Sequence, residues 1–434
     1  MAKSDLAGRI ESHKAVVGVI GLGYVGLPLA MAFARKGIRV IGFDVDERKT
    51  KLLMRGKSHI PDIEASIVAD VVGKKRFSAT TKFDGISKCD ALIICVPTPL
   101  RKTKDPDLTF ILAACEAAVK RLRKGQLIVL ESTTYPGTTR EMVQPVFESS
   151  GLKVGKDFHL AFSPERVDPG NKTYRIENTP KVVGGVTRRC GDLAASLYAQ
   201  IVDRVVPVSS TDAAEMVKLL ENTFRAVNIG LVNEVALMCE RLGVDVWEII
   251  EAAKTKPFGF MPFYPGPGLG GHCIPVDPNY LAWKMKALNF EPRFIDLASV
   301  VNSGMPDYVV RRTSDLLNES KRAINGSRIL VLGVAYKPGV DDIRESPALD
   351  VIKLLLDQGA GIRYHDSFVP NVSVGKTRMK SIALTPSALK SADLVLVLTA
   401  HQTVDYPHVL RHAKMVFDTR NATAGIARRN LRRL

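Results

Sequence analysis

The chain has 434 residues, enough for two or three domains, and its hydrophobic (46%) and charged (24%) contents are those of an ordinary globular protein. The formal net charge of +16 fits acidic partners, but the basic residues are dispersed except in the C-terminal "ARRNLRRL", and no nucleic-acid-binding module accompanies them. No apolar run is long enough to cross a bilayer, the first residues do not resemble a signal peptide, and the six cysteines include no C-x-x-C pair. We therefore expect a cytoplasmic protein without a metal site, a disulfide framework, a nucleic-acid partner or a membrane partner.

The N-terminal half begins with a strand, a glycine turn and a helix. Residues 16–20 are an apolar run typical of a strand buried on both faces, and a helix is predicted over residues 25–36. The turn between them, residues 21–26, reads "GLGYVG", and a second strand over residues 38–43 ends at Asp44. A G-x-G-x-x-G turn in this setting, with an acidic residue after the next strand, indicates a dinucleotide-binding unit.

The same turn predicts which dinucleotide is bound. Glycines let the backbone approach a pyrophosphate that rests on the helix N-terminus. Asp44 is placed to accept hydrogen bonds from the adenosine ribose and would repel a 2′-phosphate, so NAD is preferred over NADP. The alternative is a glycine turn in an αβ unit that binds no nucleotide.

Three further strands and a long helix follow. Strands are predicted over residues 91–97 and 126–133, and a short one, "FHLAF", precedes the segment 163–170. From about residue 209 the pattern is helical for about thirty residues, or roughly 45 Å. Asp212 followed by Glu215 is a capping signal for its start, and a glycine closes it. A helix this long spans two domains or forms a subunit interface.

The C-terminal half repeats the strand, loop, helix and strand order, with Asp366 after its second strand. It has only Gly333 in place of a G-x-G-x-x-G turn, so a second dinucleotide is not expected there. The predicted fold is α/β, with two Rossmann-like doubly wound domains joined by a long central helix.

Seven motifs in chain order resemble those of the nucleotide-sugar 6-dehydrogenase family, which includes the UDP-glucose and GDP-mannose dehydrogenases. They are "GLGYVGLP", "CVPTP", "ESTTYPGTT", "SPERVDPG", "EMVKLLENTFRAVNIGLVNE", "GPGLGGHCIPVDP" and "GVAYKPGVDDIRESPA". The resemblance implies an NAD-binding Rossmann domain over residues 1–208 and a UDP-sugar-binding α/β domain over residues 306–434. Between them, residues 209–305 are expected to form a helical linker and dimerisation region with a cysteine loop.

The resemblance also implies a reaction. Members of the family oxidise a primary alcohol at sugar C6 to a carboxylate, using two NAD⁺ and a cysteine that traps the aldehyde as a thiohemiacetal and then a thioester. Cys273, in "GGHCIPVDP", matches that nucleophile. Its alternative is a buried structural thiol, which is how the other five cysteines are interpreted.

Five further residues match the family's catalytic positions. Lys218 and Asn222 lie one helical turn apart, where the family holds the C6 oxygen, although many such pairs are simply exposed surface residues. Asp277 matches a loop aspartate that orients Lys218 or the attacking water, or else it is a turn residue before a proline. Glu165 matches the general base for the hydrolytic water and Thr133 the residue that positions it, with loop capping as the alternative for both.

The remaining candidates bind ligands. The residues that the resemblance assigns to the cofactor are Gly21, Gly23, Tyr24, Val25, Gly26, Asp44, Lys49, Val96, Pro97, Thr98, Ser132 and Arg344. Those that it assigns to the substrate are Glu165, Arg166, Val167, Lys218, Asn222, Tyr264, Gly268, Gly271 and Lys337. The charges of Lys337 and Arg344 suit a diphosphate and a pyrophosphate, with solvated loop charge as the alternative.

One departure from the family bears on the substrate. The stretch "KPFGFMPFYPGPG" lacks the arginine that related enzymes extend to the neighbouring subunit's sugar, and Phe260 and Phe263 are placed to pack on an acetamido group. We therefore expect a UDP-N-acetylglucosamine 6-dehydrogenase that is at least a homodimer. UDP-glucose, UDP-N-acetylgalactosamine and UDP-N-acetylmannosamine remain alternative substrates. A two-electron hydroxyacid-type dehydrogenase and a non-catalytic nucleotide-sugar sensor are the alternative functions.

Overall fold

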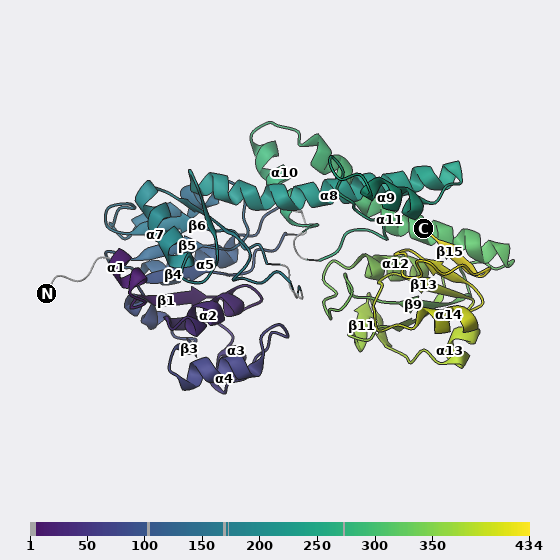
Figure 1. Ribbon diagram of the computed structural model, residues 1–434, viewed down its shortest axis with the longest axis horizontal. Helices are drawn as coiled ribbons and strands as arrows, with labels where there is room; N and C mark the ends of the chain where they lie inside the picture. Colours follow the sequence, from purple (N-terminus) through teal and green to yellow (C-terminus); the bar gives the residue numbers. More distant parts are fainter. Residues whose placement is uncertain (1–5, 102–104, 168–170, 172, 272–273) are drawn as a thin grey trace. The chain divides into compact units, whose positions relative to one another are not determined.

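The structure, a computed structural model, describes all residues except 1–5, 102–104, 168–170, 172 and 272–273. The chain divides into two compact units (Figure 1): unit 1 is Met1–Glu221 with Asn279–Asn289, and unit 2 is Asn222–Pro278 with Phe290–Leu434. The long helix α8, Thr211–Leu242, contributes residues to both units. Among the described residues, no helix is long and apolar enough to cross a membrane.

Unit 1 is built on an eight-stranded sheet in the order β3-β2-β1-β4-β5-β6-β7-β8. All neighbours are parallel except β6 and β7, which are antiparallel. The first six strands have the order of a dinucleotide-binding fold, which places the reversal of strand order between β1 and β4. The strands are β1 (Val16–Ile20), β2 (Arg39–Phe43), β3 (Phe77–Thr80), β4 (Ala91–Ile94), β5 (Leu127–Leu130), β6 (His159–Phe162), β7 (Lys181–Gly185) and β8 (Val205–Val208).

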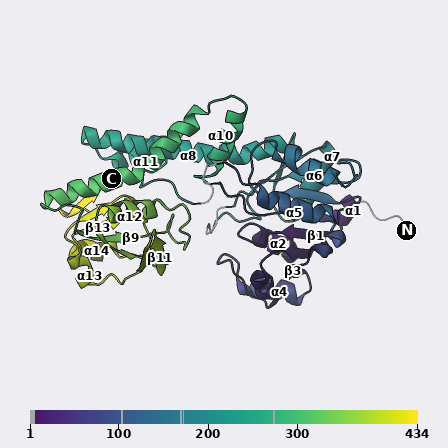
Figure 2. The same ribbon diagram turned by 180° about the vertical axis from the view of Figure 1, so that it is seen from behind.

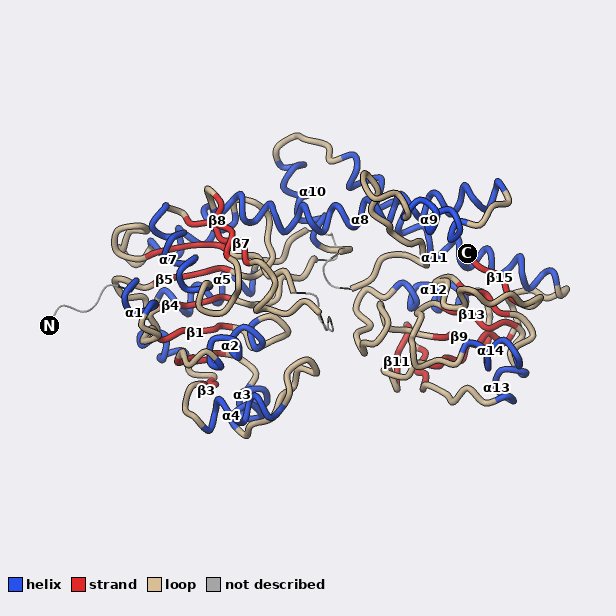
Figure 3. Tube along the Cα trace, viewed as in Figure 1, coloured by secondary structure: helices blue, strands red, loops and turns tan. Residues whose placement is uncertain are grey.

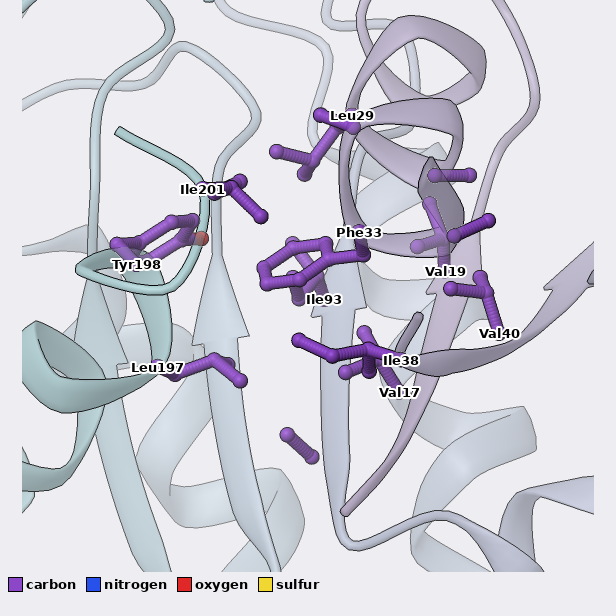
Figure 4. Packing of buried hydrophobic residues seen from close by; sticks show 14 of the residues in the cluster. Val17, Val19, Leu29, Phe33, Ile38, Val40, Ile93, Leu197, Tyr198 and Ile201 are labelled. Atoms are coloured by element: carbon purple, nitrogen blue, oxygen red, sulfur yellow. The ribbon is translucent and has the colours of Figure 1, made fainter. Parts of the chain in front are cut away.

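Helices pack on this sheet through an apolar core. Side chains at alternate positions of β1, such as Val17 and Val19, pack with Phe33 of α2 and Tyr198 of α7 (Figure 4). Both ribbon views show α2 alongside β1 (Figures 1 and 2). The helices of unit 1 are α1 (Leu6–Glu11), α2 (Gly26–Arg35), α3 (Glu47–Met54), α4 (Ala65–Gly73), η1 (Phe83–Lys88), α5 (Thr109–Val119), η2 (Thr139–Val143), α6 (Gln144–Glu148), α7 (Arg188–Tyr198) and most of α10 (Asp277–Ala287).

Unit 2 contains a parallel sheet of five strands in the order β10-β9-β13-β14-β15, with a separate antiparallel hairpin. The predicted α/β character of both halves is therefore confirmed. The strands are β9 (Arg328–Leu332), β10 (Gly361–His365), β13 (Leu394–Val397), β14 (Val416–Asp418) and β15 (Leu431–Arg433), and the hairpin is β11 (Asn371–Val374) with β12 (Thr377–Lys380). The helices are α9 (Val246–Lys254), α11 (Arg293–Glu319), α12 (Pro347–Asp357), α13 (Pro386–Ser391) and α14 (Tyr406–His412).

The long helix ends as predicted but does not begin as predicted. Gly243, at φ +69°, follows the last turn of α8. At the start, Ser210 caps the helix, since its Oγ accepts the Ala213 N–H at 3.1 Å. The prediction that Glu215 completes this cap is wrong, because its carboxylate instead accepts hydrogen bonds from Gly137 and Thr139.

Helix α11 was not predicted from the sequence. It packs against α8, with Gly230 so close that a Cβ there would lie 3.2 Å from the Ala298 Cα. The proposed domain boundary between residues 305 and 306 falls inside α11, so it is not a break in secondary structure. The three-domain division itself stays a prediction.

Candidate active site

The glycine turn after β1 leaves open space at the N-terminus of α2. Gly21 has a φ of +89°, and a Cβ on Gly26 would lie 1.9 Å from the Gly21 carbonyl oxygen, so both positions require glycine. A Cβ on Gly23 would meet no atom within 4 Å. Tyr24 is exposed and Val25 partly so, and both lie in the same turn. The turn therefore has a tight base and an unobstructed outer side.

Asp44 is fixed at the end of β2. Its Oδ2 accepts the Leu22 N–H at 2.9 Å and its Oδ1 accepts the Asp46 N–H at 2.9 Å. Lys49 places its Nζ 3.7 Å from Asp44 Oδ2. The carboxylate is thus linked both to the glycine turn and to the start of α3, which sets its orientation.

The loops after β4 and β5 are joined to each other. Ser132 accepts the Val96 N–H at 2.9 Å and donates to the Val96 carbonyl at 2.8 Å. The Thr98 carbonyl accepts a hydrogen bond from Tyr280 of α10 at 2.8 Å. Thr133, the next residue after Ser132, is partly exposed. These loops lie at the carboxyl ends of adjacent parallel strands, beside the glycine turn.

A cluster of buried charges lies at the same edge of the unit 1 sheet. Lys181, the first residue of β7, bonds to Glu131 after β5 and lies 3.3 Å from Glu165 Oε2. Glu165 Oε1 accepts the N–H groups of Arg166 at 2.8 Å and Val167 at 2.6 Å. Burial raises the pKa of Glu165, opposed by the Val167 hydrogen bond and by the positive charge of Lys218.

Arg166 and Lys218 complete this part of the site. The Arg166 guanidinium donates to the Pro180 carbonyl at 2.8 Å and pairs with Glu221 of α8 at 2.5 Å. Lys218 lies one turn before Glu221 on α8 and is buried. The Lys218 ammonium and the Glu165 carboxylate of unit 1 therefore influence each other electrostatically.

Unit 2 carries the other predicted catalytic residues. Asn222 and Asp277 are both buried, and the Asn222 Nδ2 donates to Asp277 Oδ2. Arg225 donates to the Asn222 Oδ1, which fixes the orientation of the amide. Asp277 is the first residue of α10, so a buried amide on α8 is bonded to the end of the cysteine loop. Cys273 itself lies outside the described residues.

Within unit 2, the glycine loop before Cys273 packs directly on the loop between β9 and α12. The described residues between α9 and α10, 255–271 and 274–276, form loops and turns (Figure 3). Gly268 and Gly271 have φ values of +133° and +87°. A Cβ on Gly271 would lie 2.8 Å from the Tyr336 ring, and the Gly271 N–H donates to the Arg344 carbonyl at 3.1 Å. Only glycine allows this close approach.

Three candidate ligand-binding side chains already have protein partners. The Lys337 ammonium lies 5.7 Å from the centre of the neighbouring tyrosine ring. Arg344 is exposed and donates to Asp342 at 2.6 to 3.1 Å. Tyr264 stacks on Trp247 with ring centres 6.3 Å apart and donates to a glutamate of α9 at 2.8 Å. A ligand would have to share or replace these contacts.

A buried aspartate–histidine pair supports the loop that carries Lys337. Asp366 Oδ2 accepts the N–H groups of Val334 and Ala335, and it is 3.0 Å from His401 Nε2. Burial would raise the pKa of Asp366, but these hydrogen bonds lower it to about 2. The other ring nitrogen of His401 accepts the Gly339 N–H at 3.2 Å. Both ends of the loop are thus tied to one pair of side chains.

The chain matches three domains of one family. The NAD-binding domain of the UDP-glucose/GDP-mannose dehydrogenase family matches residues 15–202, the central domain residues 212–304, and the UDP-binding domain residues 330–425. The chain belongs to the UDP-glucose/GDP-mannose dehydrogenase family.

Relatives of this nucleotide-sugar dehydrogenase differ in their sugar. A UDP-N-acetyl-D-glucosamine 6-dehydrogenase of Pseudomonas aeruginosa is 37% identical, covering 89% of this chain and 90% of the relative. A UDP-N-acetyl-D-mannosamine dehydrogenase of Yersinia pestis is also 37% identical, covering 89% and 93%. The solved structure of a UDP-D-ManNAc dehydrogenase from Pyrococcus horikoshii superimposes with a TM-score of 0.88 at 32% identity, covering 96% of this chain and 98% of that one.

The family match fixes the cofactor of the dehydrogenase as NAD. The residues of unit 1 fit it. Open space beside Gly23 at the N-terminus of α2 suits a pyrophosphate, and the fixed carboxylate of Asp44 suits a ribose diol but not a 2′-phosphate.

Four residues that the sequence analysis did not select lie at these sites. Lys181 and Glu131 lie beside Glu165, Arg225 holds Asn222, and the Arg420 guanidinium lies against the loop, 2.4 Å from where a Cβ on Gly266 would be. Burial lowers the pKa of Arg420 to about 10. Three of them could have been found from the sequence as charged residues at or near the ends of apolar strands. Lys181 begins β7, Glu131 follows β5, and Arg420 lies two residues after β14.

Proposed function

We propose that this dehydrogenase oxidises the C6 hydroxyl of UDP-N-acetylglucosamine to the carboxylate in a four-electron reaction through Cys273. The observation that carries the proposal is the buried pair Asn222–Asp277, whose aspartate closes the cysteine loop. A buried amide bonded to a buried carboxylate, four residues after a cysteine in the sequence, suits a site that binds and polarises a reacting oxygen. The product would supply surface-polysaccharide synthesis in the cytoplasm.

The proposed roles follow from the chemistry of each side chain. Lys218 and Asn222 donate hydrogen bonds to the C6 oxygen and stabilise the negative charge that develops on it. NAD held at the glycine turn and Asp44 would supply the hydride acceptor for both oxidations. The Cys273 thiolate adds to the C6 aldehyde, and the resulting thiohemiacetal is oxidised to a thioester. Glu165 then removes a proton from the water that hydrolyses the thioester, and Thr133 positions that water.

We assign one ligand to the region of each large sheet, NAD to the N-terminal one and the UDP moiety to the C-terminal one. Residues 1–208 bind NAD through the glycine turn, Asp44, Lys49 and the loops after β4 and β5. Residues 306–434 bind the UDP moiety, with Lys337 contacting the diphosphate and Arg344 the cofactor. Residues 209–305 supply Tyr264, the glycine loop and the dimer contacts. The matches to the NAD-binding, central and UDP-binding family domains support this division.

Sugar specificity is tested by assaying the purified protein with four substrates in parallel: UDP-N-acetylglucosamine, UDP-N-acetylmannosamine, UDP-N-acetylgalactosamine and UDP-glucose. We expect the highest kcat/KM with UDP-N-acetylglucosamine and two NADH for each sugar consumed. A higher kcat/KM with UDP-N-acetylmannosamine would replace the substrate but keep the mechanism. One NADH for each sugar would refute the four-electron reaction.

The nucleophile is tested by Cys273→Ala, with Cys115→Ala as the matched control. Cys115 is buried in α5, and burial raises its pKa to about 12, so it stays a neutral thiol. We expect Cys273→Ala to form no carboxylate product and Cys115→Ala to keep both NADH. Full turnover by Cys273→Ala would favour a two-electron dehydrogenase.

We also propose that the protein is a homodimer through α8 and α11. In unit 2, α8 exposes Phe224, Leu231 and Met238 at intervals of seven residues, which places them on one side of the helix. Helix α11, which packs against α8, exposes Phe294 and Leu297. Exposed apolar rows of this kind on adjoining helices are typical of a self-complementary interface between two copies of a chain.

Light scattering after gel filtration tests the dimer. We expect the mass of two chains for the wild type and of one chain for Leu231→Glu. Val45→Glu is the control, because Val45 is an exposed apolar residue on unit 1, at the end of β2. A Leu231→Glu protein with the wild-type mass would exclude this helix face as the interface.

A further inference from the structure

Two buried charged residues of unit 1, Lys181 and Glu131, have no role in the proposed mechanism. Lys181 is 5% exposed and Glu131 is 1% exposed. The Lys181 ammonium bonds to Glu131 Oε1, lies 3.3 Å from Glu165 Oε2, and lies 5.2 Å from the centre of the Tyr198 ring. The second oxygen of Glu131 is 3.5 Å from the Cys95 Sγ. The ammonium is therefore enclosed by two carboxylates and an aromatic ring.

Such an arrangement is costly unless the charges are paired. Removing a charged group from water costs several kcal/mol, so a buried ammonium without a carboxylate would be neutral or absent. Glu131 alone is sufficient to pair Lys181. The contact to Glu165 is additional to that pair, and it brings an ammonium group to a carboxylate that the fold has also buried.

Glu165 has its two oxygens in different environments. Oε1 is occupied by two backbone N–H groups, from Arg166 and Val167. Oε2 has a single protein contact among those that the structure records for it, the Lys181 ammonium. A carboxylate oxygen can accept more than one hydrogen bond, so Oε2 is the atom that can also accept one from water.

We propose that Lys181, held in place by Glu131, is a positioning residue that keeps Glu165 ionised and orients its Oε2 toward the hydrolytic water. This inference rests on the proposed function. In the hydrolysis step the water oxygen bonds to C6 while Glu165 takes a proton from the water. The C6–S bond breaks, and its electron pair stays on sulfur as the thiolate. The proton on Glu165 then leaves, so the net change is thioester plus water to carboxylic acid plus thiol.

The charges around Glu165 set the direction of the effect. Burial raises the pKa of Glu165, and the positive charges of Lys218 and Arg166 oppose that rise. Burial lowers the pKa of Lys181 to about 7 even with Glu131 bonded to it, so the positive charge beside Glu165 is present below about pH 7, where the acid limb is measured. The titratable and charged groups that face Glu165 come from β7, α8 and α7, from the loops after β4 and β5, and from its own loop. They are Lys181, Lys218, Tyr198, Cys95, Glu131 and Arg166.

The test compares thioester hydrolysis in wild type, Lys181→Met and Lys181→Arg. An adjacent opposite charge lowers a carboxyl pKa by about 1 to 3 units, so Lys181→Met is expected to move the acid limb of the hydrolysis rate up by about 1 to 3 pH units. On the acid limb, at a pH below the midpoints of both proteins, the thioester should then persist about 10- to 1,000-fold longer than in wild type, measured as the enzyme–sugar adduct by intact mass spectrometry after rapid quenching. Lys181→Arg keeps the charge and should keep the wild-type profile.

A double variant tests whether the effect of Lys181→Met comes only from misfolding. Lys181→Met leaves Glu131 buried and unpaired, so Glu131→Gln is combined with it to remove the pair as a unit. The same shift is expected in the double variant. A hydrolysis profile of the double variant that coincides with wild type would overturn the inference and leave the proposed function intact. A wild type that forms no adduct and fewer than two NADH would instead overturn the proposed function and the inference together.

Discussion

A buried pair of amides, Asn233 of α8 and Asn302 of α11, anchors the start of the glycine loop. The Asn233 Oδ1 accepts the Gly266 N–H at 3.0 Å, and its Nδ2 donates to the Asn302 Oδ1 at 2.8 Å. Asn302 in turn donates to the Ala226 carbonyl at 3.0 Å. All of these groups belong to unit 2 and are buried. The loop that leads to Cys273 therefore depends on one side chain of α8.

Replacing this side chain by alanine removes two hydrogen bonds at once. It leaves the Gly266 N–H and the Asn302 Oδ1 buried without a partner. Each stranded polar group costs about 1 to 3 kcal/mol, so Asn233→Ala should lower the free energy of unfolding of unit 2 by about 2 to 6 kcal/mol. The loop should also lose its fixed start. Because small misplacements of reacting groups cost up to about a hundredfold in rate, kcat should fall by at least about tenfold.

Tryptophan fluorescence can report on unit 2 alone. The chain has two tryptophans, Trp247 in unit 2 and Trp283 in unit 1. In a Trp283→Phe background, urea unfolding followed through Trp247 therefore measures unit 2. The matched control is Asn228→Ala on the same helix, where a partly exposed amide donates to the Phe224 carbonyl at 2.7 Å. Its effect should stay within about 0.5 kcal/mol, as for most surface substitutions.

The comparison between the two alanine variants tests whether the amide pair stabilises unit 2 and positions the glycine loop. If Asn233→Ala and Asn228→Ala unfold at the same urea concentration with the same slope, the amide pair does not stabilise unit 2. If Asn233→Ala loses stability but keeps the wild-type kcat, the pair stabilises the helices without positioning the loop.

Three other predictions follow from single side chains. Asp44→Ser should raise KM for NAD about tenfold. It should also lower the preference for NAD over NADP, measured as kcat/KM with NAD divided by kcat/KM with NADP. Burial raises the pKa of Glu215 to about 7 from an ordinary value of 4.5, so the folded state binds more protons and unit 1 should lose stability as pH rises between those values. Glu215→Gln should abolish that loss in urea unfolding followed through Trp283, and an unchanged pH dependence would contradict it. His401→Ala removes the acceptor for the Gly339 N–H and should raise KM for the UDP-sugar about fivefold, the equivalent of about 1 kcal/mol.

Much of the fold could be predicted from short segments. The strands around residues 16–20 and 38–43, the glycine turn and the length of α8 were all predicted, because each depends on neighbours in the sequence. Parallel strands with helical crossovers then allow few strand orders, and the observed order of the first six strands of unit 1 is the one expected for a dinucleotide-binding fold. The glycine requirement at Gly21 and Gly26 likewise follows from a tight turn.

The family motifs identified candidate site residues but did not predict which side chains contact them. They identified Glu165, Asn222 and Asp277 as candidates, and the structure places Asn222 and Asp277 in contact although they are 55 residues apart. Helix α11 was missed, because its face toward α8 contains small and polar residues, including Ala298 and Asn302, and gives a weak apolar pattern.

Only the tertiary structure shows which charges and amides meet. The spacing of Asp212 and Glu215 matched a helix cap, yet Glu215 bonds to the start of η2, 76 residues earlier, since a carboxylate takes whichever donors the packing brings to it. Lys181 was not selected from the sequence, because its partners come from the end of β5 and from the Glu165 loop, which only the packing brings to it. Local sequence determines the conformation of each segment and the side of it that is buried. The partner of a buried polar group depends on elements that are distant in the chain, so it is decided when the layers pack.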